Sequence, residues 1–155
     1  MWTPIGKRPT ALGHHRYQWL HVTAFVQPTT GEAVWFLSTG LSKRLFEALL
    51  ASFARQVGAG RARHVILVLD NAGWHGPKGL VVPDGVTLVF LPPYGPELQP
   101  AERLWPLVDE PVANRHFATL DDLDAVAAER CRRLDAATIQ PHTDFHWWPR
   151  PIQPS

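Results

Sequence analysis

His64-Val65-Ile66-Leu67-Val68-Leu69-Asp70 is an apolar run that stops abruptly at a carboxylate. Such a run is typical of a β-strand that is covered on both faces, as in a parallel sheet. A second apolar stretch, Val86 to Leu91, follows a segment rich in glycine and proline that has room for at most a short helix near residues 78–82. Two apolar strands joined by a crossover favour an α/β fold with parallel neighbouring strands.

Upstream of this run the sequence predicts a hairpin and a helix. Residues 17–26 are rich in apolar and β-prone side chains, residues 27–32 are turn formers, and residues 33–37 are apolar again, which is the pattern of a β-hairpin. Ser42 is a good helix N-cap. Apolar residues then recur at helical spacing until Gly58, a typical stop signal, so we expect an amphipathic helix between them.

Downstream of the second strand, prolines dominate. Residues 92–100 cannot form a regular element, but Pro100 suits the first position of a helix, which Pro106 should bend or end early. A last helix is expected from about Thr119, because Asp122 completes a capping-box pattern with it. Residues 138–155 are rich in proline and tryptophan and suggest an irregular tail packed on the surface.

Bulk composition narrows the class of protein. The chain has 155 residues, 45% of them apolar, so we expect a single globular domain over residues 1–155. No apolar run is long enough to span a membrane and the start is no signal peptide. Cys131 is the single cysteine, which excludes an internal disulfide and a cysteine-rich zinc site. A reducing cytosol is the simplest location, and a net charge of +1 neither indicates nor forbids binding to nucleic acid.

Two acidic residues are candidates for chemistry. Asp70 ends the apolar strand, and ligands of open α/β sheets collect at such strand ends; the alternative is an aspartate that opens a turn. Glu102 is the third residue of the helix begun by Pro100, and the alternative there is a capping glutamate favoured by the helix dipole. The prolines fix how this helix begins, so Glu102 is expected near Asp70 if the two strands are parallel neighbours.

Two carboxylates that converge repel each other unless a cation lies between them. Oxygen ligands select Mg²⁺ or Mn²⁺ over zinc. A pair of such ions suits in-line displacement at phosphorus, because one activates the attacking oxygen and the other stabilises the leaving oxygen. The residues alone therefore suggest metal-assisted phosphoryl transfer.

Other residues carry weaker hypotheses, and each has a plainer interpretation. Histidines could ligate zinc or simply be exposed, the paired tryptophans could stack on bases or pack on the core, and an arginine group could meet phosphate or form a solvated helix face. These residues are His14, His15, His21, His142, His146, Trp147, Trp148, Arg130, Arg132 and Arg133.

Two segments carry a resemblance to a known family. Val68-Leu69-Asp70-Asn71-Ala72-Gly73-Trp74-His75 and Leu91-Pro92-Pro93-Tyr94-Gly95-Pro96-Glu97-Leu98-Gln99-Pro100-Ala101-Glu102-Arg103-Leu104-Trp105 resemble the DDE superfamily endonuclease domain of bacterial insertion-sequence transposases, the mariner-like group. The resemblance implies a ribonuclease H-like mixed sheet flanked by helices and an enzyme of DNA transposition. It also implies DNA as partner, a homodimer in the active complex, and Mg²⁺ or Mn²⁺ as cofactor in the bacterial cytoplasm.

The resemblance also assigns roles to residues. Asp70 matches the second catalytic acid and Glu102 the third, and both would bind the metal ions. Asn71 and His75 match positions beside the site and would have supporting roles. Gly95 stands where the family usually has serine, and Gln99 where it often has asparagine.

The resemblance leaves one acid unaccounted for. The family's first aspartate lies on the opening strand of the sheet, upstream of residues 2–9, and no acid precedes Glu32 in this chain. We therefore expect a sheet without its first, central strand, and a carboxy-terminal catalytic portion that is inactive and poorly stable by itself. The alternatives are a non-catalytic DNA-binding or assembly module and another ribonuclease H-like nuclease.

Overall fold

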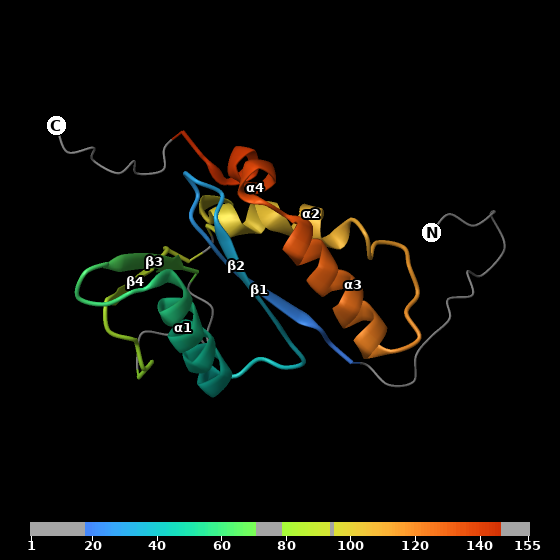
Figure 1. Cartoon of the computed structure of the whole chain (residues 1–155), viewed down its shortest axis with the longest axis horizontal. Helices are drawn as coiled ribbons and strands as arrows, with labels where there is room; N and C mark the ends of the chain where they lie inside the picture. Colours follow the sequence, from blue (N-terminus) through green and yellow to red (C-terminus); the bar gives the residue numbers. More distant parts are fainter. Residues whose placement is uncertain (1–17, 71–78, 94, 147–155) are drawn as a thin grey trace.

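The structure, a computed structural model, describes residues 18–70, 79–93 and 95–146. Its first element is an antiparallel hairpin of β1 (His21–Val26) and β2 (Ala33–Ser38). The second pair, β3 (Val65–Leu69) and β4 (Val86–Phe90), is parallel and in register from its first residues to its last (Figure 1). Both expected strand pairs are confirmed, and within the described residues they form two separate two-stranded sheets.

The expected helix between the pairs is α1 (Lys43–Val57). The Ser42 hydroxyl accepts a hydrogen bond from the Leu45 amide at 3.1 Å, which satisfies one of the free N–H groups at the helix start. Gly58 adopts the left-handed conformation at the other end, with φ 69°, where a residue without Cβ is favoured. Both ends of this helix therefore lie where the local sequence predicts them.

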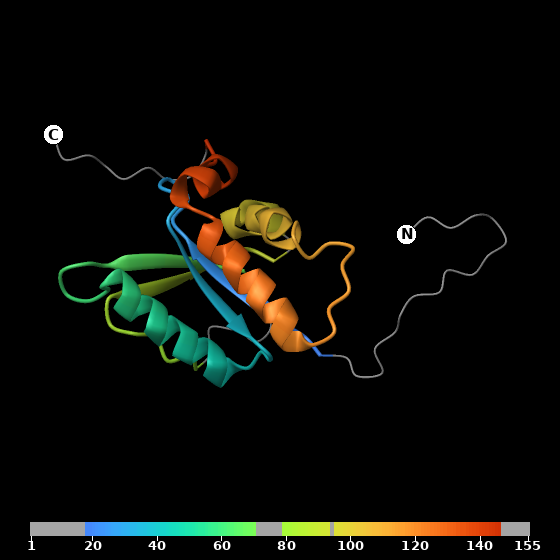
Figure 2. The same cartoon turned by 45° about the vertical axis from the view of Figure 1, so that its right-hand side comes forward.

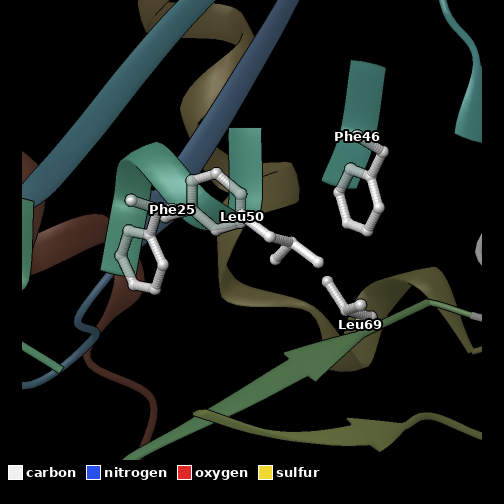
Figure 3. Packing of buried hydrophobic residues seen from close by; sticks show 5 residues of the cluster. Phe25, Phe46, Leu50 and Leu69 are labelled. Carbon is white, nitrogen blue, oxygen red and sulfur yellow. The ribbon is translucent and has the colours of Figure 1, made fainter. Parts of the chain in front are cut away.

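The first hydrophobic core lies between the hairpin, α1 and β3. Phe25 of β1 stacks on Phe53 of α1 with ring centroids 4.4 Å apart. Leu50 is fully buried, and Figure 3 shows it on α1, above Leu69 at the end of β3. This cluster, which also includes Phe46, fixes the end of β3 relative to the hairpin.

The prediction that β3 is covered on both faces is wrong. Leu69 is buried against α1, but Ile66 is 67% exposed and Val89 of β4 is 44% exposed. Successive side chains of a strand point to opposite faces, and α1 covers one face of this sheet. The other face is apolar in sequence and open to solvent at these two positions.

The proline-rich segment forms short helices. Residues 79–82 contain no helix, which agrees with the expectation of at most a short one there. Two 3₁₀ segments, Pro96–Leu98 (η1) and Pro100–Leu104 (η2), lead into α2 (Trp105–Asp109). Pro106 is predicted to bend or end the helix begun by Pro100. The 3₁₀ segment η2 ends at Leu104, and Pro106 lies in the first turn of α2, where its missing N–H has no intrahelical partner to lose.

Helix α3 (Leu120–Arg133) begins as predicted. The Asp122 amide donates to the Thr119 hydroxyl at 3.1 Å, and the Thr119 amide donates to the Asp122 carboxylate at 3.2 Å. This reciprocal pair is the capping box expected from the sequence.

The expectation of an irregular tail from residue 138 is wrong for its first part. Residues Ala136–Thr143 form α4, N-capped by Asp135. Ile139 and Thr143 are buried, and the Thr143 hydroxyl donates to the Pro28 carbonyl in the hairpin turn at 3.1 Å. Packing against η2 and the hairpin turn, rather than local propensity, therefore holds this helix despite Pro141 within it.

A second core joins these helices to the opposite face of the hairpin. Its buried members come from η2, α2, α3 and α4, and partly buried side chains of β1 and β2 pack on it. Figures 1 and 2 show α1 on one side of the hairpin and α2 and α3 on the other. The hairpin is thus the centre of the fold. The described residues contain no helix long and apolar enough to cross a membrane.

Cys131 lies in this second core and is a free thiol. Its burial raises the pKa of the thiol, although the neighbouring Arg130 and Arg132 charges lower it. We expect a disulfide reagent at pH 8 to label the native chain at least about 100-fold more slowly than the urea-unfolded chain, because the thiol must first become exposed by local opening. Equal rates in the two states would contradict the second core.

Candidate functional site

A cavity of about 1250 Å³ lies between β1 and β3. Every residue of both strands lines it, together with side chains of α1 and of the segment from Gln99 to Trp105. Both predicted acids, Asp70 and Glu102, are among the lining residues. The tertiary structure therefore places two carboxylates from distant parts of the sequence in the lining of one cavity. That they lie close enough to share a cation stays a prediction.

Asp70 owes its position to the strand that precedes it. It follows β3 directly and is partly buried. The Leu91 amide donates to the Leu69 carbonyl at 2.8 Å, which extends the parallel pairing to the last residue of β3. The backbone is therefore hydrogen-bonded as far as Leu69, the residue before Asp70. The buried Leu69 side chain anchors the strand end from which the Asp70 carboxylate projects.

Glu102 lies in the middle of η2 and is also partly buried. Its neighbour Leu104 is fully buried, which fixes the rotation of this short helix. The Trp105 indole N–H donates to Glu102 Oε2 at 3.1 Å. This bond orients the carboxylate.

Reasoning from the sequence missed the role of Trp105. Trp105 belongs to the second motif segment, but the sequence alone does not predict its hydrogen bond to Glu102. The spacing held the signal, since residues three apart on a helix are neighbours and an indole N–H needs an acceptor when it is partly buried.

The supporting residues Asn71 and His75 lie outside the described residues, as do His14, His15 and the Trp147–Trp148 pair. The structure therefore does not test their expected roles. His142 and His146 are described and exposed.

The donor chemistry of Asp70 and Glu102 fits a hard divalent cation, because both offer carboxylate oxygens. Two side chains are too few for a complete protein site. Within the described residues, no group of three or more His, Cys, Asp or Glu side chains could hold a metal ion. The pair therefore matches the ligand type that a divalent cation prefers. Glu32 and Asp109 line the same cavity, but no third such side chain in the described part of the chain joins the pair in a metal-binding group.

The arginine group on α3 is paired with acids. Arg132 and Arg133 contact Glu129 at 2.8 and 2.7 Å, and Arg130 pairs with Glu110 and donates to the Leu107 carbonyl. The hydrogen bond from Arg132, followed by that from Arg133, lowers the pKa of Glu129. This arrangement fits the plainer interpretation of a solvated, charge-balanced helix face better than a phosphate-binding patch.

Comparison with known proteins identifies the family. Residues 1–124 match the DDE superfamily endonucleases. The uncharacterized protein y4pE/y4sA of Sinorhizobium fredii is 37% identical over 106 residues, which cover 68% of this chain and 77% of that protein. No solved structure matches the chain significantly.

The chain therefore belongs to the DDE superfamily endonuclease family. The matched residues include the hairpin, α1, the β3–β4 pair and both candidate acids, and they end within α3. The mixed α/β architecture is compatible with the ribonuclease H-like fold that the resemblance implies. Nucleases of this superfamily act on DNA and generally use divalent metals, which agrees with the carboxylate pair in the cavity.

Proposed function

We propose that residues 1–155 are the carboxy-terminal portion of a transposase catalytic domain, which cleaves and joins DNA strands by metal-assisted phosphoryl transfer. One observation carries this proposal: Asp70 and Glu102 come from separate segments and line the same cavity. Membership of the endonuclease family supports the same conclusion. We further propose action as a homodimer on element ends and target DNA in the bacterial cytoplasm.

In this proposal Asp70 and Glu102 hold Mg²⁺ or Mn²⁺ through their carboxylate oxygens. When bound, such ions would activate the attacking water or 3′-hydroxyl and neutralise charge on the leaving oxygen. Asp70 is positioned by the paired end of β3, and Glu102 is oriented by the Trp105 indole. Asn71 and His75, which follow Asp70 in the sequence, would support the site.

We also propose that this chain is inactive until a third carboxylate joins the pair. The reason is electrostatic, because two carboxylates leave much of the charge of two divalent ions unbalanced in a partly buried cavity. This proposal is motivated by the described residues, among which no group of three or more His, Cys, Asp or Glu side chains could hold a metal ion.

The test is a nicking assay on labelled duplex DNA taken from the sequences that flank the coding region. The chain would be compared with a fusion that carries an added amino-terminal strand with one aspartate. We expect the fusion to nick DNA in Mg²⁺ or Mn²⁺ but not in EDTA, and the unfused chain to remain at background.

The second candidate is a non-catalytic DNA-binding or assembly module, which the incomplete carboxylate set favours. This candidate predicts that DNA binding is unchanged by EDTA and that the fusion, too, cleaves nothing. That result would reject the nuclease proposal.

A further inference from the structure

The indole of Trp105 holds one of the two carboxylate oxygens of Glu102. Its N–H donates to Glu102 Oε2 at 3.1 Å, and no hydrogen bond from the described part of the chain reaches Oε1. Both side chains line the cavity between β1 and β3. The two oxygens of this candidate metal ligand are therefore unequal, because a hydrogen bond polarises the oxygen that accepts it and draws electron density away from a cation.

The backbone around Glu102 keeps this arrangement in place. Leu104 is fully buried, and η2 packs against α4 and β1. The Arg103 guanidinium lies over the Phe145 ring, 5.7 Å from its centroid, and within the described residues it forms no ion pair with Glu102. Trp105 is thus the described side chain that orients the Glu102 carboxylate.

The number of oxygens that a carboxylate gives to a cation affects which cation it prefers. Ca²⁺ accepts bidentate carboxylates in a large and flexible shell, whereas Mg²⁺ demands a near-octahedral shell with short bonds. Mn²⁺ also suits octahedral sites built from carboxylate, carbonyl and water oxygens. A glutamate with one oxygen held by an indole offers a single strong oxygen, which suits the octahedral cations and disfavours Ca²⁺.

We propose that Trp105 is a positioning residue that sets the cation preference of the site. It limits Glu102 to one metal-binding oxygen, Oε1, and so favours Mg²⁺ and Mn²⁺ over Ca²⁺. This inference rests on the proposed function, in which Glu102 is a metal ligand, and adds the basis of the choice among hard divalent cations. A glutamate–tryptophan bond that only stabilised η2 would have no effect on that choice.

The experiment compares cation binding by the full chain and by Trp105→Phe, which removes the indole N–H and keeps an aromatic ring. Mn²⁺ binding is followed by the relaxation rate of water protons, and Mg²⁺ and Ca²⁺ are titrated as competitors. We expect Mg²⁺ binding to weaken at least about tenfold, as is usual when a metal ligand loses its hydrogen-bond partner. Ca²⁺ binding should change less than about twofold, because the freed Oε2 can now join a bidentate shell.

Two further variants show where the effect arises. Trp35→Phe is the matched control, because Trp35 is another partly buried tryptophan and does not line the cavity; it should leave both affinities unchanged. In the Glu102→Gln background, Trp105→Phe should not change the ratio of Mg²⁺ to Ca²⁺ affinity further, since the two residues act as a coupled pair. Circular dichroism checks that each variant is folded, and a general loosening of η2 would weaken both cations alike.

The outcomes separate this inference from the proposed function. If Glu102→Gln weakens binding of all three cations but Trp105→Phe leaves the ratio of Mg²⁺ to Ca²⁺ affinity unchanged, this inference alone is overturned. An equal fall of the ratio in Trp35→Phe would also overturn it. If the unsubstituted chain binds Mn²⁺ no better than Glu102→Gln does, Glu102 is not a metal ligand, and the metal assignment in the proposed function fails as well.

Discussion

Asp70→Asn and Glu102→Gln should each lower cation-dependent nicking by at least about 10³-fold when they are made in the fusion that carries the added amino-terminal strand. Each change removes one charged ligand from a site that must hold divalent cations. Metal ions stabilise the transition state by several kcal/mol, and a loss of about 4 kcal/mol corresponds to a 10³-fold lower rate. The amide replacements nearly preserve side-chain volume, so the first core and the Trp105 contact region should keep their packing. Single-turnover rates in Mg²⁺ and Mn²⁺ measure the effect.

Glu97→Gln is the matched control for Glu102→Gln. Glu97 lies in the same proline-rich segment, but it is exposed and does not line the cavity. Its substitution should change the rate less than about twofold, as is usual for an exposed charge. If Glu97→Gln and Glu102→Gln lower the rate equally, the loss would result from any change of charge in the proline-rich segment. The assignment of Glu102 as a metal ligand would then fail.

Gly31→Ala should destabilise the fold by about 2–5 kcal/mol, because it combines two penalties. Gly31 has φ 77°, a conformation that costs alanine free energy. An added Cβ would also lie 2.2 Å from the Ala136 carbonyl oxygen and 2.6 Å from the Gln140 amide nitrogen. Both are backbone atoms of the α4 region, so α4 must shift away from the hairpin turn. Urea unfolding followed by far-ultraviolet circular dichroism measures the loss.

Gly58→Ala separates the two penalties. Gly58 has a similar φ of 69°, but a Cβ there would meet no atom within 4 Å. This variant should lose only about 1–2 kcal/mol, the cost of the left-handed conformation. Equal losses of stability in the two variants would show that Gly31 does not pack against α4. They would also contradict the placement of α4 against the hairpin turn.

Local sequence determined most of the elements in the described part of the chain. Capping residues indicated where α1 and α3 begin. The hydroxyls of Ser42 and Thr119 each accept a hydrogen bond from an amide of their own helix, and this bond requires no contact with a distant residue. Apolar runs marked β3 and β4, and turn formers separated β1 from β2. The two motif segments pointed to Asp70 and Glu102 and to the endonuclease family, since both signals lie in short contiguous stretches.

Tertiary structure decided the rest, because the free energies involved come from contacts between distant residues. Helix α4 contains Pro141 and has little helical signal. It is held by the burial of Ile139 in the second core and of Thr143 against the hairpin turn. The exposure of Ile66 depends on whether a second layer covers β3, which its apolar sequence cannot reveal. Likewise, only packing of the two cores brings Asp70 and Glu102 to one cavity. Residues adjacent in sequence specify where a helix or strand begins and ends. The side chains that pack around a residue are determined by the whole fold.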